Sequence, residues 1–152
     1  MMGLRIQNLV WVDSAYKVPR YFVNGMDFLD EGVPISGFFE VLVDGQLPLM
    51  RRTDAIFKES NYNTALMVGN RNHKIIKRNT YFFLDGKNVI EVPSNRKKLM
   101  LLFGDKAEEM EKFINNNSLP TRDPGSLFQI FTYFNSQFEG FQPIISQLLD
   151  EN

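Results

Sequence analysis

Two Asp-Gly pairs, each between apolar runs, constrain the fold of this chain more than any other feature. The first lies in residues 37–52, GFFEVLVDGQLPLMRR, and the second in residues 80–92, TYFFLDGKNVIEV. Glycine adopts positive φ without steric penalty, and aspartate tolerates it better than most residues, so both pairs suit the tight turns that join antiparallel strands. We therefore predict two successive β-hairpins, with turns at Asp44-Gly45 and Asp85-Gly86, that form a β-meander.

Further strands are expected before and between these hairpins. Residues 6–12 and 18–23 are apolar and β-branched, which predicts a pair of strands followed by a loop over residues 24–36 with at most a short strand. Residues 55–59 fit either a strand or one helical turn, and residues 65–70 fit another strand. The segment between the hairpins is thus the least determined part of the chain.

The hydrophobic period changes from two to about 3.6 after the second hairpin. Residues 94–98 open with the possible cap residues Ser94 and Asn95, and residues 99–103 continue as a short apolar helix that stops at Gly104. Asp105 can cap a second helix over residues 106–115. A third helix is predicted to begin at Ser126, because an apolar stripe repeats every three or four residues: Leu127, Ile130, Phe131, Phe134 and Phe138. A short terminal turn is expected over residues 144–149.

Together these patterns predict an α+β fold in which an antiparallel β-meander is packed by two or three C-terminal helices. At 152 residues the chain is long enough for one hydrophobic core without disulfides. We expect a single domain over residues 1–152, β-rich over 4–93 and helical over 95–149.

Composition excludes several kinds of chemistry. The chain has no cysteine, which rules out disulfides, a thiol nucleophile and thiolate metal sites. His73 is the only histidine and has no neighbouring acid or second histidine, so it lacks the partners for a metal site or a catalytic triad. We therefore predict no catalytic residues, no metal site and no cofactor. No run of about 18 apolar residues occurs and the start has no export-signal pattern, so no membrane span is expected.

Positive charge is concentrated in the middle of the chain, although the net charge is only −1. Residues 51–98 contain eleven Lys or Arg against four acids, whereas residues 104–152 are acidic. A mixed, solvated surface is the simpler interpretation of this distribution. The alternative is a binding surface made of basic side chains and two tyrosines that are candidates for exposed contacts: Arg71, Lys74, Lys77, Arg78, Tyr62 and Tyr133.

Several short motifs resemble those of a group of uncharacterised, usually exported bacterial proteins. They are Gly37-Phe-Phe-Glu-Val-Leu-Val-Asp-Gly45, Arg96-Lys-Lys-Leu99 with Phe103-Gly-Asp-Lys106, and a closing apolar helix that ends in aromatic-Asn-Ser at residues 134–136. The resemblance implies a β-rich body and a periplasmic or otherwise extracytoplasmic location. It implies no activity and no catalytic residues. Members usually begin with an export signal, so the chain is expected to be a truncated or mature form. At Asp123-Pro124-Gly125 the sequence departs from the group, which suggests a later start for the last helix.

Three hypotheses for function follow. The leading one is a non-catalytic binding or structural module of the bacterial cell envelope, whose partner is a protein or another envelope component. A carboxylate-dependent hydrolase is the first alternative, for which a pair of carboxylates in a cleft would be needed; Asp44 and Asp85 are better explained by turn geometry and Glu40 by the outward face of a strand. The available carboxylates are Asp27, Asp30, Glu31, Glu40, Asp44 and Asp85. The second alternative is weak nucleic-acid binding through the basic segment 71–98, which requires Arg71, Lys74, Lys77, Arg78, Arg96, Lys97 and Lys98 to share one face.

Overall fold

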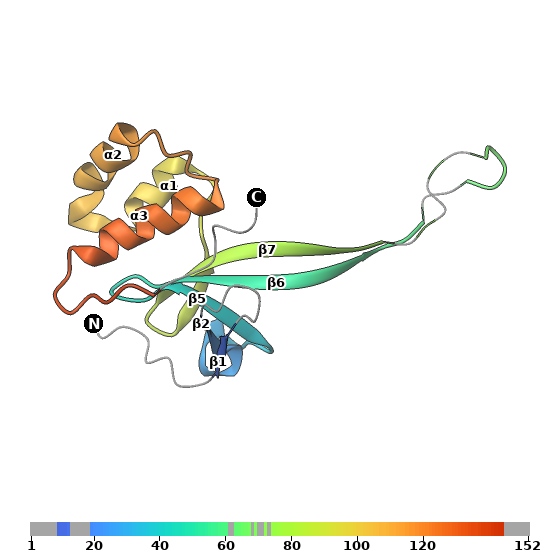
Figure 1. Cartoon of the computed structure of the whole chain (residues 1–152), viewed down its shortest axis with the longest axis horizontal. Coiled ribbons are helices and arrows are strands. Elements are labelled where there is room, and N and C mark those ends of the chain that lie inside the picture. Colours follow the sequence, from blue (N-terminus) through green and yellow to red (C-terminus); the bar gives the residue numbers. More distant parts are fainter. Residues whose placement is uncertain are drawn as a thin grey trace.

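The computed structural model describes residues 9–12, 19–60, 63–67, 69, 72 and 74–144. Their strands form one mixed sheet in the order β1-β2-β5-β6-β7-β8-β3-β4, and three helices follow in the C-terminal part (Figure 1). The strands are β1 (Leu9–Val12), β2 (Pro19–Asn24), β3 (Leu29–Asp30), β4 (Val33–Pro34), β5 (Phe38–Val43), β6 (Leu49–Lys58), β7 (Lys74–Asp85) and β8 (Asn88–Glu91). The helices are α1 (Arg96–Leu101), α2 (Ala107–Asn116) and α3 (Pro124–Ser136), with short 3-10 turns at Gly25–Asp27 and Gly104–Lys106.

The predicted α+β class and the C-terminal helices are confirmed, but the sheet as a whole is not a simple meander. Strands β5, β6, β7 and β8 are consecutive antiparallel neighbours, whereas β3 pairs with β8 in parallel, at Leu29 and Asn88. The expected N-terminal pair is present over the described residues, where β1 lies antiparallel to β2. The predicted loop over residues 24–36 contains two strands of two residues each.

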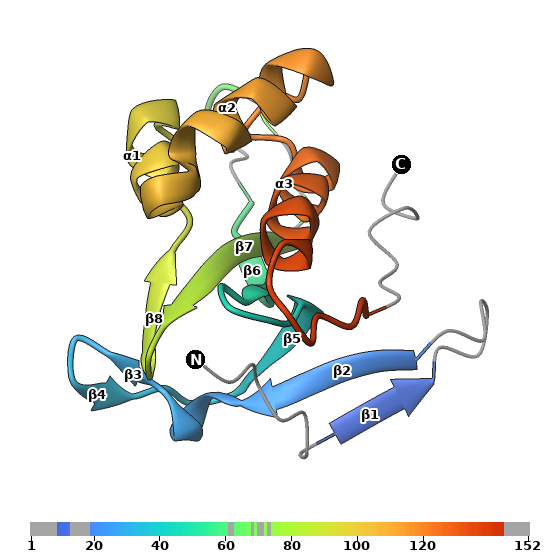
Figure 2. The ribbon, with the colours of Figure 1, turned by 90° about the vertical axis from the view of Figure 1, so that its left-hand side faces the viewer.

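The sheet curls because β2 and β3, which have four other strands between them in the sheet order, are joined by one short turn (Figure 2). Gly25 stands at this junction. Its N–H donates to the Gly37 carbonyl over 2.7 Å, and its own carbonyl accepts from the N–H groups of Phe28 and Ile35. A Cβ at this position would lie 2.7 Å from the Ile35 carbonyl oxygen, so only glycine allows the backbone segments to approach this closely.

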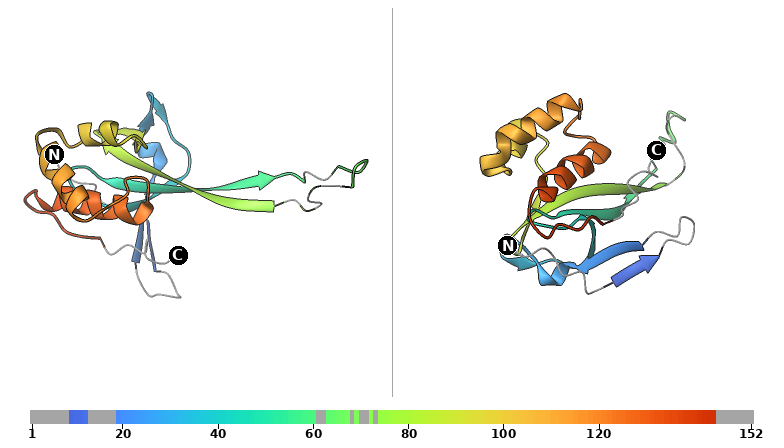
Figure 3. Two further views of the ribbon diagram at one scale, coloured as in Figure 1. Left: turned by 90° about the horizontal axis from the view of Figure 1, so that it is seen from above. Right: turned by 60° about the vertical axis from the view of Figure 1, so that its left-hand side comes forward.

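Alternate residues of the central strands contribute to two cores. The three helices lie against one face of the sheet, called here the helix-bearing face (Figure 3). This face carries Leu49 and Phe83, which pack with the buried side chains of the helices. The opposite face carries Met50 and Leu84, which pack with Val23, Phe28, Phe39, Val41 and Val89. Each large side chain removed from water in this way contributes about 1.5–3 kcal/mol. The side-chain period of two in β6 and β7 therefore determines which residues face the helices.

The first predicted hairpin is present, but the prediction of a two-residue turn at Asp44-Gly45 is wrong. Residues 44–48 form a longer loop between β5 and β6, stabilised by the Asn135 side chain of α3. The Asn135 Oδ1 accepts from the Leu47 N–H over 2.7 Å, and Nδ2 donates to the carbonyls of Leu47 and Phe131. Gly45 has φ +141°, and a Cβ on it would lie 2.7 Å from Asn135 Oδ1. The loop after β5 and the C-terminal part of α3 thus contact each other in the fold.

The second hairpin is present and much longer than predicted. Its turn is Gly86-Lys87, with Asp85 and Asn88 as the last register pair, and β7 extends back to Lys74. Of the two interpretations of residues 55–59, the strand is correct through Lys58. The strand predicted from residue 65 is not formed over residues 65–67, which are a turn, whereas residues 68 and 70 lie outside the described residues.

The helix predictions differ from the structure mainly at their first residues. Asn95 caps α1 as expected, because its side chain accepts from the N–H groups of Lys97 and Lys98. Helix α2 begins at Ala107 without a side-chain cap from Asp105. Helix α3 begins at Pro124, earlier than either prediction, because Asp123 accepts from the Ser126 N–H and proline suits the first helical position. The terminal turn predicted over 144–149 lies outside the described residues after Ile144.

Candidate functional site

A two-stranded ribbon projects from the sheet, away from the three helices (Figures 1 and 3). We define the β6–β7 arm as residues 53–58 of β6, residues 74–79 of β7 and the described connecting residues 63–67. Strand β5 pairs with β6 only as far as Arg51, and β8 pairs with β7 only from Phe82 onward. In the described part of the chain, the arm strands therefore have each other as their only sheet neighbours.

The arm exposes apolar side chains on both faces and at its connection. On the helix-bearing face, Phe57 lies opposite Ile75, with exposed fractions of 58% and 74%. On the opposite face, Ile56 lies opposite Ile76. Leu66 and Met67 of the connecting residues are exposed as well. Exposed apolar side chains that gather on one element are typical of interaction sites, whereas scattered ones are not informative.

Most charged side chains of the arm are positive, and all of them except Lys77 lie on the face opposite the helix-bearing face. Lys58 lies directly across from Lys74, a like-charge pair that disfavours the ribbon in isolation. Two positions nearer the body than Ile76, Arg78 lies across from Asp54. Lys77 is on the helix-bearing face, across from Ala55.

A buried ion-pair cluster lies at the base of the arm, also on the helix-bearing face. Glu40 accepts from Arg20 Nε at 2.9 Å, from Arg20 Nη2 at 2.7 Å and from Arg51 Nη2 at 2.7 Å. Both Glu40 and Arg51 are only 5% exposed. Burial by itself raises the pKa of the Glu40 carboxyl, but hydrogen bonds and charge from Arg20 and Arg51 outweigh it and hold this pKa below its usual value. Glu40 is therefore ionised and held in place, which does not suit a general acid.

This cluster forms one wall of a hollow of about 510 Å³. Lys77 adds a third cation, so the lining residues carry three positive charges against the single carboxylate of Glu40. Thr53 and Asn79 lie between Lys77 and Arg51, and the Thr53 hydroxyl donates to Asn79 Oδ1 over 2.7 Å. The hollow is thus a positively charged site, which we call the cationic hollow.

Two aromatic side chains complete the lining of the cationic hollow. Phe22 and Phe38 are its aromatic residues, and the Arg20 guanidinium lies 5.5 Å from the centre of the Phe22 ring. This cation–π contact orients Arg20 while its Nε and Nη2 bind Glu40. Phe38 is exposed, so it offers apolar surface beside the charged groups.

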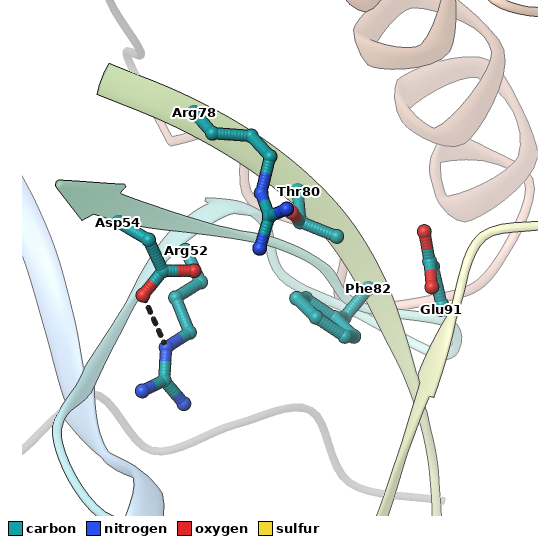
Figure 4. Close-up of a pocket in the computed structure, with 6 residues that line it drawn as sticks. All are labelled: Arg52, Asp54, Arg78, Thr80, Phe82 and Glu91. Carbon is teal, nitrogen blue, oxygen red and sulfur yellow. Dashed lines mark hydrogen bonds and ion pairs between the residues drawn. The ribbon is translucent and has the colours of Figure 1, made fainter. Parts of the chain in front are cut away.

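A second hollow, of about 410 Å³, lies on the opposite face of β6 and β7 (Figure 4). Arg52 Nε pairs with Asp54 at 3.3 Å, and the other charged lining residues are Arg78 and Glu91. Its two cations are therefore balanced by two carboxylates. Unlike the cationic hollow, it has no excess charge to attract an ion.

The structure brings together only part of the binding surface predicted from the sequence. Lys74, Lys77 and Arg78 are on β7, but Lys77 faces the helix-bearing side while the other two face the opposite side. Arg71 and Tyr62 lie outside the described residues, as does His73. The basic residues 96–98 belong to α1 in the helical cluster, away from the arm (Figure 1).

Tyr133 lies far along the chain from the arm and is engaged by helix packing. Its ring stacks on Phe113 at a centroid distance of 3.9 Å, and its hydroxyl donates to Glu109 Oε1 over 3.2 Å. Desolvation, followed by this hydrogen bond and the charge of Glu109, raises the pKa of the Tyr133 hydroxyl. Its contacts give it a role between α2 and α3.

The expectation that Glu40 lies on an outward strand face is wrong. Its side chain is buried because Arg20 and Arg51 neutralise and hydrogen-bond it. Sequence reasoning also missed both arginines, together with Phe22 and Phe38. The alternation of Phe38, Glu40 and Leu42 was a signal for one shared face, but nothing local linked Glu40 to its two partners.

The other predicted carboxylates do not assemble into a pair in either hollow. Neither hollow is lined by two of them. Asp44 accepts from the Gly45 N–H over 2.8 Å, which is a turn contact. Within the described ranges, no group of three or more His, Asp or Glu residues is placed to hold a metal ion.

No protein-family model matches the chain, and no curated protein or solved structure shows significant similarity to it. Among the helices in the described part, none has the length and apolar character needed to cross a membrane.

Proposed function

We propose that this protein is a non-catalytic binding or structural module that docks onto another protein of the bacterial cell envelope through the β6–β7 arm. The observation that carries the proposal is the exposure of apolar side chains on both faces of a ribbon that projects from the body. An isolated two-stranded ribbon is marginally stable in water. An arm with exposed apolar side chains is therefore more stable when a partner covers it.

Protein is favoured over nucleic acid as the partner by the character of the arm. Several of its exposed side chains are large and apolar, including the cross-strand pair Phe57 and Ile75. The basic residues of α1, which the nucleic-acid hypothesis needs on the same face, belong to the helical cluster. A hydrolase is less well supported, because the best-buried carboxylate, Glu40, is held ionised between two arginines.

Site-specific photo-crosslinking in the native cell tests the docking role of the arm. A photoreactive phenylalanine analogue replaces Leu66 in the arm, and a matched control carries it at Leu101 of α1; the two leucines are 68% and 79% exposed. We expect one discrete protein adduct from position 66 and none from position 101. The double substitution of Phe57 and Ile75 by serine, placed in the position-66 variant, should remove that adduct.

The outcomes separate a docking arm from a generally adhesive surface. Equal adducts from both positions, or an adduct that survives the Phe57→Ser and Ile75→Ser changes, would contradict the proposal. A nuclease-sensitive adduct from position 66 would assign the arm to nucleic acid instead.

Cell fractionation tests the proposed location. Mass spectrometry of the native polypeptide, including its N-terminal peptide, should find it in the envelope or periplasmic fraction with a leader removed. Recovery from the cytosol with Met1 retained would refute the envelope part of the proposal and leave the arm to be tested with cytosolic partners.

A further inference from the structure

We infer that the cationic hollow binds a carboxylate of the partner protein, presented by a segment that also places an apolar side chain on Phe57 and Ile75. The identity of the ligand as a protein segment rests on the proposed function. The preference of the hollow for a carboxylate joined to an apolar group rests on its own lining residues.

The charge of the cationic hollow favours an anionic ligand. Arg20, Arg51 and Lys77 face the single carboxylate of Glu40, so the lining residues carry a net charge of +2. Arg51 is 5% exposed, and charges with little access to water attract a counter-ion more strongly than charges on an open surface. A second carboxylate entering the hollow would reduce this excess charge. Lys77 lines the hollow and is exposed to solvent, so it can pair with a carboxylate that enters from solvent.

The apolar surface beside the charges favours a ligand that also has an apolar part. Phe38 is 52% exposed, and Phe22 lies next to Arg20 at the same hollow. A small inorganic anion would leave both rings without a contact. A carboxylate at the end of an aliphatic or aromatic group would place its charge near the cations and its apolar part against Phe38.

The helix-bearing face of β6 and β7 runs without interruption from the cationic hollow to the β6–β7 arm. Thr53, Ala55 and Phe57 alternate along the helix-bearing face of β6, opposite Asn79, Lys77 and Ile75 of β7. Phe57 is four positions after Thr53, which is about 13 Å along an extended strand. An extended partner segment could therefore place an acidic side chain in the hollow and an apolar side chain, four residues away, on Phe57 and Ile75.

The ligand chemistry is tested on the purified full chain by NMR titration. The probe is 3-phenylpropionate, an aromatic carboxylate, and the matched neutral compound is 3-phenylpropionamide. We expect saturable shifts of the backbone amides of Thr53, Lys77 and Asn79 with the carboxylate below roughly 20 mM, a range that covers millimolar affinity. The neutral amide should produce no saturable shift at these positions.

Two lysine substitutions separate local recognition from general attraction. Lys77→Met should weaken carboxylate binding about fivefold, as expected for one partly solvated ion pair. Lys74→Met makes the same change of charge on the opposite face of β7 and should leave the affinity unchanged. Both substitutions are on exposed positions, so the fold is expected to be retained.

Four results would overturn the inference: no saturable shift with the carboxylate, equal shifts with the neutral amide, equal weakening by both lysine substitutions, or tighter binding of inorganic phosphate. The last result would assign the hollow to phosphate groups. Loss of the Leu66 crosslink would refute the proposed function without changing the titration result. A failed titration with the crosslink retained would refute only the carboxylate site.

Discussion

Replacing Glu40 by glutamine tests whether the buried ion pairs are an essential part of the fold. The substitution keeps the size and planar shape of the side chain but removes its charge. Arg51 would then keep a positive charge at a position that is 5% exposed, and Arg20, with 22% exposure, would lose the same partner. The main cost arises from this uncompensated buried charge rather than from lost packing.

Removing one partner of a buried ion pair typically costs about 3–5 kcal/mol. Arg20 retains partial access to water, so the lower half of this range is expected. For a chain of this length, each kcal/mol lowers Tm by about 2–4 °C, which predicts a decrease of roughly 6–16 °C. Urea unfolding followed by circular dichroism should show the same loss as a lower transition midpoint.

A matched substitution on the surface supplies the control. Glu108 pairs with Lys112 at 3.1 Å, but both side chains are largely exposed, so Glu108→Gln should cost no more than about 0.5 kcal/mol. The combined substitution of Glu40 and Arg51 by leucine should be less destabilising than Glu40→Gln, because the more deeply buried of the two arginines is then removed together with the carboxylate. Equal urea midpoints for Glu40→Gln and Glu108→Gln would show that the buried ion pairs are not essential to the fold.

The remaining predictions concern pH and three substitutions at local contacts. Because the pKa of Glu40 is lowered in the folded state, its contribution is complete above the ordinary glutamate pKa of about 4.3 and is lost as pH falls through the folded value; unfolding of the wild type and Glu40→Gln should therefore converge in acid. Asn135→Ala should cost about 1–3 kcal/mol in urea unfolding, because it leaves the Leu47 N–H without its acceptor, and a loss below 0.5 kcal/mol, of the order of a neutral surface change, would contradict this. Gly45→Ala should be similarly destabilising, since φ is +141° and the new Cβ meets Asn135, and equal stability would show that the loop relaxes freely. Asn95→Ala should cost about 1 kcal/mol through loss of the α1 cap, whereas an unchanged transition midpoint would exclude a capping role.

The features that the sequence predicted well depend on neighbouring residues. The second hairpin follows from Gly86, which adopts φ +62° in its turn, and from the apolar residues on each side. The start of α1 follows from Asn95, whose side chain reaches N–H groups two and three residues away. Interactions between residues this close along the chain can be predicted from the sequence, because such residues lie near one another whatever the tertiary fold.

The loop of the first hairpin could not be predicted from neighbouring residues. Its strands are predictable from their apolar residues, but its loop is longer than the Asp44-Gly45 pair suggested. The difference arises from Asn135, which is 88 residues away from Leu47 and hydrogen-bonds both its N–H and its carbonyl. Once α3 packs on the sheet, these bonds replace those of a two-residue turn.

The α+β class, most strands and helices, and the concentration of positive charge in the middle of the chain could be predicted from the sequence. Which of these charges act together depends on the tertiary fold. Arg20, Glu40 and Arg51 meet because β2, β5 and β6 are neighbours in one register, and Lys77 joins them on the same face while Lys74 and Arg78 do not. Side chains alternate between the two faces of a strand, so the pairing of distant strands determines both the cationic hollow and the two-faced arm.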